Sequence, residues 1–295
     1  MTADASETSL TARFEAARPQ LGAIAYRMLG SIDDAQDAVQ EAWLRLNRGS
    51  ADDIANLDAW LTTVVARICL NTLRDRQARH REEPVAQLPD PIVDAHGEFD
   101  PEHRAMLADA VGLALFVVLD TLPPAERLAF VLHDVFTVPF DQIAPIVDRT
   151  PEATRKLASR ARRRIRQADP VPDADIAAQR EAVDAFFAAG RSGDFDRLVS
   201  VLHPDVVLRG DFGSGAGLFR AEGASSVAKL ARGYAAPERE VRPATVNGAA
   251  GAVVYVAGRP TTIMAFVVRS GRVAAIDVLA DPERISRLDL KAVSG

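Results

Sequence analysis

The chain has 295 residues, 48% of them hydrophobic, and a net charge of −6 at pH 7. That length suits about two domains, or three small ones, and the composition is typical of a globular protein. No apolar run approaches the roughly 20 residues that cross a bilayer, the N-terminus lacks a signal-peptide pattern, and the single cysteine, Cys69, excludes an intramolecular disulfide. We therefore expect a cytoplasmic protein with no membrane partner, no cofactor and no metal.

The basic residues are gathered in two places, although the chain as a whole is acidic. Residues 149–166 hold a run of arginines and one lysine against a single acid, Glu152, and a smaller cluster lies at residues 74–81. A local basic patch can bind nucleic acid whatever the net charge of the whole chain. The two patches indicate DNA contact at two places, and the acidic remainder indicates another partner.

The first part of the chain, from residue 14 to about residue 81, has helical patterning throughout. A helix is predicted to start at Ser31, because a serine followed by acids is typical of a helix N-terminus, and one apolar stripe then recurs at i, i+3, i+4 spacing. A second helix is predicted from about Asp58 into the basic cluster. Residues 82–101 are acidic and rich in proline, which predicts a linker.

Residues 105–168 are predicted to form a second helical domain. Helical patterning runs up to the double proline at 123–124, and a further apolar-rich helix follows over residues 125–136. A short helix is expected over residues 140–147. Pro145 is tolerated there because the helix has only just begun.

The end of this domain has the punctuation of a helix-turn-helix. After a turn at residues 148–149, Thr150 can cap a helix whose first position is Pro151, where the missing N–H costs nothing. A short helix, a tight turn and a capped basic helix are what docking in the DNA major groove requires. A merely solvated basic face is the competing interpretation. The apolar face of the last helix is expected to consist of Ala153, Leu157, Ala161 and Ile165.

After a second proline-containing linker, residues 169–175, the patterning changes to α+β. Two helices are predicted, over residues 176–190 and 194–202. Strand-like runs follow, separated by glycine-bearing turns, and we expect them to form an antiparallel sheet. These runs are residues 206–208, 253–256, 261–268 and 273–279.

The helix predicted after Ser31 contains the sequence DDAQDAVQEAWLR at residues 33–45. This sequence resembles region 2.2 of the extracytoplasmic-function (ECF) sigma factors, a branch of the sigma-70 family. The resemblance implies that the polar side of the helix binds core RNA polymerase, at the clamp helices of the β′ subunit. A solvated acidic face is the competing interpretation. The polar side chains concerned are Asp34, Gln36, Asp37, Gln40 and Glu41.

The next predicted helix reads AWLTTVVARICLNTLR at residues 59–74, which is similar to regions 2.3–2.4 of the same family. In that family these regions open the −10 promoter element and hold the non-template strand. The residue types suit this task, because aromatic rings stack on unpaired bases and cations pair with phosphates. A core tryptophan is the competing interpretation of Trp60. The −10 residues implied are Trp60, Arg67, Asn71, Arg74 and Arg79.

Residues 122–132 (LPPAERLAFVL) and 143–165 resemble region 4 of the family, which reads the −35 element and contacts the flap of the polymerase β subunit. The sequence LASRAR at residues 157–162 is very close to the recognition helix of that region. Many members have a glycine where this chain has Asp148, a departure that concerns the turn more than the function. The −35 residues implied are Thr154, Arg155, Lys156, Ser159, Arg160 and Arg163.

The remaining segment resembles a SnoaL-like cone, the α+β fold of polyketide cyclases and nuclear transport factors. The resemblance rests on FFAAGRSGDFDRL at residues 186–198 and on LHPDV at residues 202–206. A SigJ-like subgroup of ECF sigma factors carries such a domain after region 4, and a proline-rich linker motif that LPDP at residues 88–91 resembles. Many relatives also have a DGGGK motif, of which DFGSG at residues 211–215 retains only part.

Enzymes with a SnoaL-like fold use a carboxylate or a histidine inside the pocket as acid or base. His203 and Asp205 are candidates that also fit a turn between helix and strand, Asp211 is another, and Asp277 fits an exposed position on its strand. Cones of this kind are concave and apolar, so a small-molecule ligand is a further alternative. We expect no catalytic residue and a domain that packs on the sigma modules and regulates them.

These features together predict a multidomain protein, with two all-α sigma modules followed by an α+β cone. The predicted function is that of an ECF sigma factor that directs core polymerase to promoters and initiates transcription, with the last domain modulating activity in cis. Two alternatives stay open: a helix-turn-helix regulator that works without polymerase, and a SnoaL-type enzyme fused to a DNA-binding module. The expected boundaries are 1–82 for region 2, 83–104 for a linker, 105–168 for region 4, 169–175 for a second linker and 176–295 for the cone.

Overall fold

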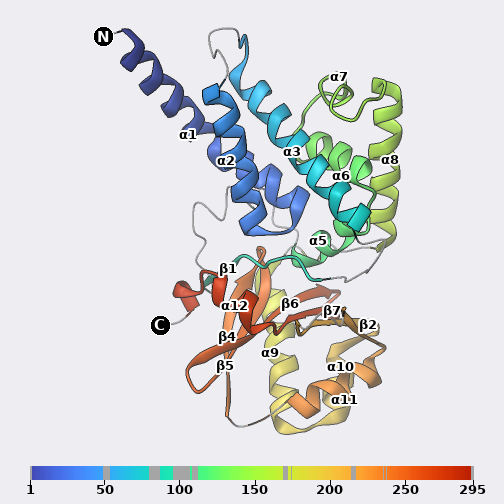
Figure 1. The fold of residues 1–295 in the computed structure, drawn as a ribbon. Helices are drawn as coiled ribbons and strands as arrows, with labels where there is room; N and C mark the ends of the chain where they lie inside the picture. Colours follow the sequence, from blue (N-terminus) through green and yellow to red (C-terminus); the bar gives the residue numbers. More distant parts are fainter. Residues whose placement is uncertain are drawn as a thin grey trace. The chain divides into compact units, whose positions relative to one another are not determined.

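The computed structural model shows a chain that forms two compact units (Figure 1). The first unit contains Met1–Glu83, Pro101–Ala108 and Val118–Ala168, and the second contains Pro84–Asp100, Asp109–Val117 and Asp169–Gly295. The residues that the structure describes are 2–48, 54–79, 87–95, 107, 112–168, 172–173, 175–213, 217–234, 236 and 238–293.

The first unit is helical, and its helices begin at the capping residues of the sequence. Ser31 Oγ accepts a hydrogen bond from the N–H of Asp34 at 3.3 Å, and Asn56 Oδ1 accepts one from the N–H of Ala59 at 3.1 Å. Within the described part of the chain, no helix combines the length and apolarity of a membrane span. The helices are α1 (Thr2–Leu29), α2 (Ile32–Arg48), α3 (Leu57–Arg79), α6 (Pro124–Phe130), the π-helical turn η2 (Val131–Val135), α7 (Phe140–Ile143) and α8 (Pro151–Ala168).

The short helix before the predicted turn ends earlier than expected. α7 stops at Ile143, and residues 144–148 form turns, so the predicted extent to residue 147 is wrong. Pro145 explains the early end, because it has no N–H to continue the helical hydrogen bonds. The turn nevertheless leads directly to α8, which starts at Pro151 as predicted.

The buried face of α8 differs from the predicted one in its first two turns. Ala153 and Leu157 are only half-buried, and Thr154 is buried instead. Thr154 can be buried because its hydroxyl donates to the carbonyl of Thr150 at 2.9 Å, which satisfies the polar group inside the helix. The buried residues of α8 are Thr154, Ala158, Ala161 and Ile165.

The second unit is an α+β domain on a seven-stranded sheet of order β1-β4-β5-β6-β7-β2-β3. Strands β4 to β7 follow one another along the chain and pair antiparallel, but β2 and β7 are parallel, so the prediction of a wholly antiparallel sheet is wrong. No hairpin joins β2 to β7, so no tight turn sets their relative direction. The strands are β1 (Val93–Ala95), β2 (Leu202–Asp211), β3 (Phe219–Glu222), β4 (Arg239–Val246), β5 (Ala249–Val256), β6 (Arg259–Arg269) and β7 (Arg272–Leu279).

Helices cover this sheet, and two apolar cores lie on its opposite faces. One core contains Phe186 and Phe266 under the first helices of the domain, and the other contains Tyr255 and Ile263. The sequence pattern predicts neither β3, β4 nor α11. The helices are α9 (Ile176–Ser192), α10 (Phe195–Val201), α11 (Ala224–Tyr234), α12 (Pro282–Arg287) and the 3-10 turn η3 (Lys291–Val293), and α5 (Gly112–Asp120) contributes its first residues.

Part of the first predicted linker is an ordered component of the second unit. β1 pairs antiparallel with β4, with Val93 opposite Val246. Next to this pair, the N–H of Ile92 donates to Asn247 Oδ1 at 3.1 Å, and the N–H of Asn247 donates to the carbonyl of Ile92 at 2.8 Å. The strand is too short to show a period in the sequence, and its partner is remote along the chain, so patterning alone could not reveal it.

Candidate nucleic-acid and polymerase interfaces

The turn before α8 sets the position at which this helix begins. Asp148 has a φ of 55°, in the left-handed region that favours glycine. Thr150 then caps the helix, since its Oγ1 accepts a hydrogen bond from the N–H of Ala153 at 3.2 Å. Hydrogen bonds from its own backbone N–H and from the Thr150 hydroxyl lower the pKa of Glu152. The start of α8 is thus fixed by local bonds, as the sequence predicts.

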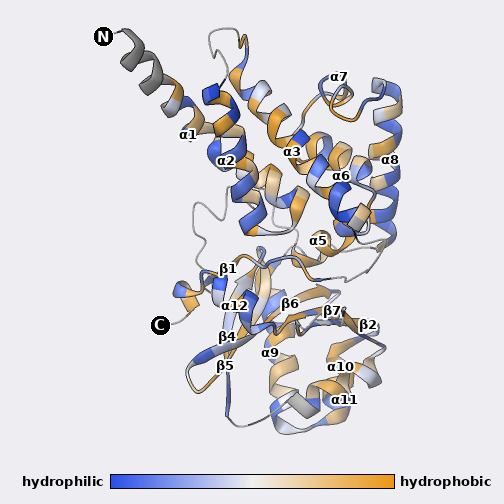
Figure 2. Cartoon of the chain, viewed as in Figure 1, coloured by the Kyte–Doolittle hydropathy of each residue, from blue (hydrophilic) through white to orange (hydrophobic). Residues whose placement is uncertain are grey.

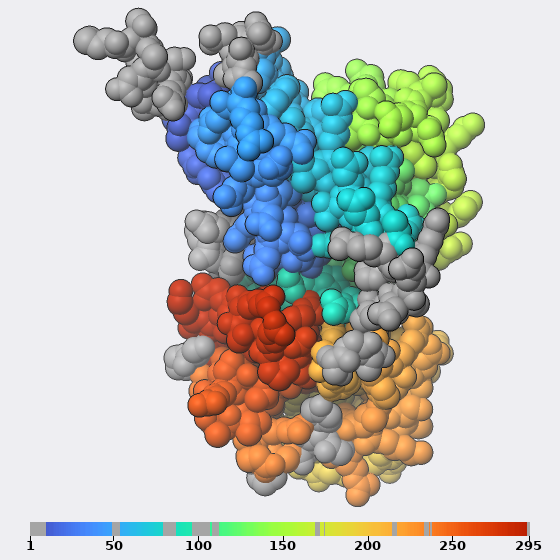
Figure 3. All heavy atoms as spheres, viewed as in Figure 1, coloured from blue at the N-terminus to red at the C-terminus, as the bar shows by residue number. Residues whose placement is uncertain are grey.

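Five of the predicted −35 residues lie on one exposed face of α8. Figure 2 shows that this helix is mostly hydrophilic, and in Figure 3 side chains of the yellow-green segment stand out from the surface. Exposed cations and a hydroxyl near the start of a helix can reach base edges and phosphates in the major groove. These residues are Arg155, Lys156, Ser159, Arg160 and Arg163.

Ion pairs on the flank of α8 hold it on the rest of the helix-turn-helix. Glu126 of α6 is 4% exposed and lies 3.6 Å from Arg160 Nη1 and 3.4 Å from Arg164 Nη1. Arg162 Nη1 pairs with Asp134 Oδ1 of η2 at 2.7 Å. The Arg160 side chain is still 52% exposed, so it can contact DNA while it anchors the helix.

Thr154 and Arg155 are adjacent in the predicted −35 set but differ in accessibility. Thr154 is fully buried and its hydroxyl is bonded inside the helix, so we leave it out of the proposed DNA contacts. The guanidinium of Arg155 lies 5.6 Å from the ring centroid of Phe140, in cation–π range. This contact steadies an exposed arginine beside the start of the helix.

The predicted −10 residues line up along α3. Trp60, Arg67, Asn71 and Arg74 stand at i, i+7, i+11 and i+14, which places them on one side of the helix. The last three are exposed and Trp60 is half-buried, so part of its ring is accessible for stacking. Arg79 is the final residue of α3, but its side chain lies outside the described residues.

One side of α2 is polar and exposed, with an apolar side chain beside it. Gln36, Asp37 and Gln40 are exposed, and Leu44, one turn beyond Gln40, is 39% exposed. A single exposed leucine is ordinary on a protein surface. Its place next to three unpaired polar side chains gives a binding partner an apolar centre with a polar rim.

The other two residues of the predicted polymerase surface have partners within the chain. Asp34 pairs with Arg76 of α3, and the Nη1 of that arginine also donates to the carbonyl of Leu29 at 3.0 Å. Glu41 pairs with Arg45 on α2 at 2.8 Å. Asp34 therefore joins α2 to α3, whereas Gln36, Asp37 and Gln40 are left exposed.

Two buried arginines join the two helical modules inside the first unit. Arg127 of α6 is 2% exposed, and its Nε and Nη2 donate to the carbonyl of Arg27 in α1 at 3.0 and 2.9 Å, while its Nη1 pairs with Asp120. Arg27 is also 2% exposed and donates to the carbonyl of Leu107. No local sequence pattern predicts a role for these arginines, because their partners lie far away along the chain.

Three of the four candidate acid–base residues, His203, Asp205 and Asp277, lie on the neighbouring strands β2 and β7. Asp277 is 2% exposed and forms a two-pronged ion pair with Arg209, at 2.5 and 3.0 Å, so its predicted exposure is wrong. The two residues face each other in the β2–β7 register. His203 and Asp205 lie within β2, so the predicted turn at these residues is wrong, and His203 Nδ1 accepts a hydrogen bond from the N–H of Asp205 at 3.2 Å. Among the described residues, no cluster of His, Cys, Asp and Glu could hold a metal ion.

The fourth candidate, Asp211, belongs to a clamp on the LPDP segment. Arg284 of α12 pairs through Nη1 with Asp211 Oδ2 at 2.7 Å and through Nε with Asp90 Oδ1 at 3.1 Å. Its Nη2 donates to the carbonyl of Leu88 at 2.6 Å, and the N–H of Leu88 donates to Asp211 at 2.9 Å. Arg284 carried no signal in the sequence pattern. Residues 214–215 of DFGSG lie outside the described residues.

Known proteins resemble this chain over each helical module and over nearly its whole length. Sigma-70 region 2 matches residues 13–79, and Sigma-70, region 4 matches residues 113–165. ECF RNA polymerase sigma factor SigJ of Mycobacterium tuberculosis (strain ATCC 25618 / H37Rv) is 38% identical over 304 residues, which cover 94% of each chain. Probable ECF RNA polymerase sigma factor SigI of the same strain is 32% identical over 280 residues, covering 95% of this chain and 96% of the relative.

A solved structure also matches almost the whole chain. The crystal structure of Mycobacterium tuberculosis extracytoplasmic function sigma factor SigJ superposes with a TM-score of 0.74 at 36% identity, covering 95% of this chain and 99% of that one. The predicted order of two helical sigma modules and a SnoaL-like α+β domain is confirmed. The chain therefore belongs to the extracytoplasmic-function family of RNA polymerase sigma factors, with the domain arrangement of the SigJ-like group.

Proposed function

We propose that this sigma factor binds core RNA polymerase and places it on promoters, with α3 at the −10 element and α8 at the −35 element. The exposed cationic face of α8 is the observation that carries this proposal. α8 is the second helix of the helix-turn-helix, the one that docks in the major groove, and Thr150 caps its start. The proposed −35 contacts are Arg155, Lys156, Ser159, Arg160 and Arg163, and the proposed −10 contacts are Trp60, Arg67, Asn71, Arg74 and Arg79.

The exposed side of α2 is proposed to bind the β′ clamp helices, and region 4 to contact the β flap. The test is capture of core polymerase by the full chain and by a triple variant, Gln36→Ala, Asp37→Ala and Gln40→Ala. We expect at least a tenfold loss of capture with unchanged binding to DNA, since the changed side chains are exposed and distant from α8 along the chain. Equal capture by both proteins contradicts this assignment.

The alternative of a plain helix-turn-helix regulator makes a different prediction for the same assay. Such a regulator binds DNA through α8 but does not capture core polymerase at any concentration. Salt dependence does not separate the two, because both neutralise phosphates. Polymerase capture does.

The C-terminal domain is proposed to regulate the sigma modules in cis by holding the segment that connects them. β1 is hydrogen-bonded to β4, and the clamp of Arg284 fixes Asp90 and Leu88 in the same domain. A connection held in this way limits how far the two modules can separate on a promoter. The boundaries proposed for these functions are 1–82 for region 2, 105–168 for region 4 and 176–295 for the regulatory domain.

Releasing the segment tests this regulation without deleting a domain. Asp90→Ala removes one carboxylate of the clamp and leaves the pair of Arg284 and Asp211 in place. We expect the amount of transcript to change several-fold with the same set of promoters. The matched control is Glu222→Gln, which removes a carboxylate from an exposed ion pair with Arg220. Unchanged transcription, together with faster hydrogen exchange of residues 88–95, contradicts regulation by this contact.

We propose regulation, not catalysis, as the role of this domain. Asp211 and Asp277 are engaged in ion pairs with Arg284 and Arg209 inside the domain, which gives both carboxylates a structural role. None of the four candidate acid–base residues lines the apolar pocket of the domain.

A further inference from the structure

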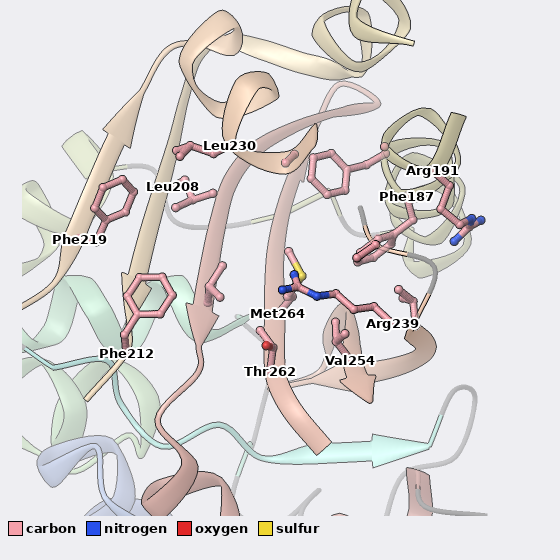
Figure 4. A pocket seen from close by; sticks show the side chains of 16 residues that line it. Phe187, Arg191, Leu208, Phe212, Phe219, Leu230, Arg239, Val254, Thr262 and Met264 are labelled. Atoms are coloured by element: carbon pink, nitrogen blue, oxygen red, sulfur yellow. The ribbon is translucent and has the colours of Figure 1, made fainter. Parts of the chain in front are cut away.

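The C-terminal domain contains an apolar pocket of about 130 Å³ between its sheet and the helices α9 and α11 (Figure 4). Of the lining residues that the structure describes, only Arg191, Arg239 and Thr262 have polar side chains. A protein cavity of about 150 Å³ lined by apolar side chains holds a benzene molecule. The pocket therefore has room for an apolar body of about one ring, with a short chain reaching toward its mouth.

Large apolar side chains are exposed at this pocket. Phe212, Phe219 and Leu230 are 44%, 43% and 38% exposed, and all three line it. Covering apolar side chains that are gathered in a concave site removes them from water, which favours binding of an apolar ligand. The rings of Phe212 and Phe219 lie 6.4 Å apart with an interplanar angle of 66°, an edge-to-face arrangement that an aromatic ligand can extend.

The described residues that line the pocket carry positive charge and include no acid. Figure 4 shows Arg239, at the start of β4, extending across the pocket toward Met264, while Arg191 lies on α9 at its edge. A guanidinium against apolar walls binds a carboxylate through two parallel charge-assisted hydrogen bonds. Arg239 has a further interaction within the chain, but the guanidinium offers five N–H donors and can serve a ligand as well.

From these observations we infer that the pocket binds a small carboxylic acid with an apolar, aromatic body. The carboxylate lies on Arg239, and the body lies among Phe187, Phe212 and Phe219. The inference concerns a site separate from α2, α3 and α8, so it holds or fails independently of promoter and polymerase binding.

Three probes with the same apolar body and different head groups test the assignment. We would titrate the full chain with 4-phenylbutyrate, 4-phenylbutan-1-ol and 4-phenylbutylamine by isothermal calorimetry. The acid is expected to bind at least about tenfold more tightly than the alcohol, and the amine most weakly, because only the acid pairs with the guanidinium. No binding of the acid at millimolar concentration, or equal binding of acid and alcohol, overturns the inference.

Variants of the lining then locate the site. Arg239→Gln should lower the affinity for the acid to that for the alcohol, and Arg239→Glu should reverse the order so that the amine binds best. Ala231→Trp fills the pocket and should abolish binding of all three probes, with circular dichroism as the check on folding. Arg220→Gln changes an exposed arginine outside the pocket and should leave every affinity unchanged. If Arg239→Glu does not change the order of the probes, the assignment is wrong even where Ala231→Trp fails to fold.

Discussion

The exposed arginines of α8 and two largely buried arginines of the C-terminal domain, Arg180 and Arg284, are the same residue type in opposite surroundings. Arg160 of α8 is 52% exposed, whereas Arg284 of α12 is 16% exposed and bonds to two carboxylates and a carbonyl. Arg180 of α9 is 8% exposed and donates to the carbonyl of Gly251 at 2.7 Å, and burial lowers its pKa. An arginine whose donors are already bonded fixes the fold, and an exposed one keeps its charge for phosphate. A chain with a net charge of −6 can therefore still present a DNA-binding face.

The largest loss of stability is expected when a largely buried arginine of the C-terminal domain is removed. Arg284→Ala leaves Asp211, 4% exposed, without its cation and should lower the free energy of unfolding of the C-terminal domain by about 3 kcal/mol. Urea denaturation of the full chain measures this loss. Arg220→Ala, on an exposed pair, is the control and should change stability by no more than about 0.5 kcal/mol. Equal losses in the two variants would mean that burial does not decide the role of these arginines.

A buried arginine of the first unit should behave like Arg284. Arg127→Ala removes the donors to the carbonyl of Arg27 and the partner of Asp120, and should cost about 2 kcal/mol in the stability of the helical unit. It should also loosen the contact between the two sigma modules, which distance measurements between spin labels on α2 and α8 can follow. A narrow, unchanged distance distribution contradicts the role given to this arginine.

Substitution of the exposed arginines of α8 should weaken DNA binding and leave the stability of the protein unchanged. Arg155→Ala is expected to leave the midpoint of unfolding unchanged and to weaken binding to the −35 element by about 1–3 kcal/mol at a defined base position. Arg163→Ala, if it contacts a phosphate, should reduce the salt dependence of binding by about one charge for all sequences alike. Binding assays over a series of salt concentrations separate the two kinds of contact.

The smallest expected effect concerns the thiol of Cys69. Burial raises its pKa to about 12, so the neutral thiol is favoured in the folded protein. Its contribution to stability is fully present below the ordinary thiol pKa of about 8.5 and is lost as the pH rises from there toward 12. At pH 8 the native protein should react with a disulfide reagent far more slowly than the urea-unfolded chain. Equal rates would contradict the burial of this side chain.

Local signals account for the part of the fold and site that sequence reasoning predicts correctly. Ser31 and Thr150 cap helices through their own neighbours, so the starts of α2 and α8 can be read from a few residues. The apolar pattern does not predict the burial of Thr154, because a hydrogen bond from its hydroxyl to the carbonyl of Thr150 allows this polar side chain to be buried.

Features that depend on distant partners are not predictable in this way. The direction of β2 relative to β7, the pairing of β1 with β4 and the clamp of Arg284 all join segments that are far apart along the chain. Residue spacing predicts the exposed face of α8, but which of its arginines also anchor the helix depends on Glu126 and Asp134. The periodicity of apolar residues shows which face of a single helix or strand is buried. It does not show which other element that face contacts.

In vitro transcription with core RNA polymerase is the decisive measurement of whether this chain directs transcription through α8. Polymerase, a library of genomic promoters and the wild-type chain are compared with a double variant, Arg155→Ala and Arg160→Ala. We expect transcripts with defined start sites only when the wild-type chain is added, and we expect the double variant to capture polymerase without producing these transcripts. Sequence-specific DNA binding by the wild-type chain without any transcript would contradict the assignment as a sigma factor.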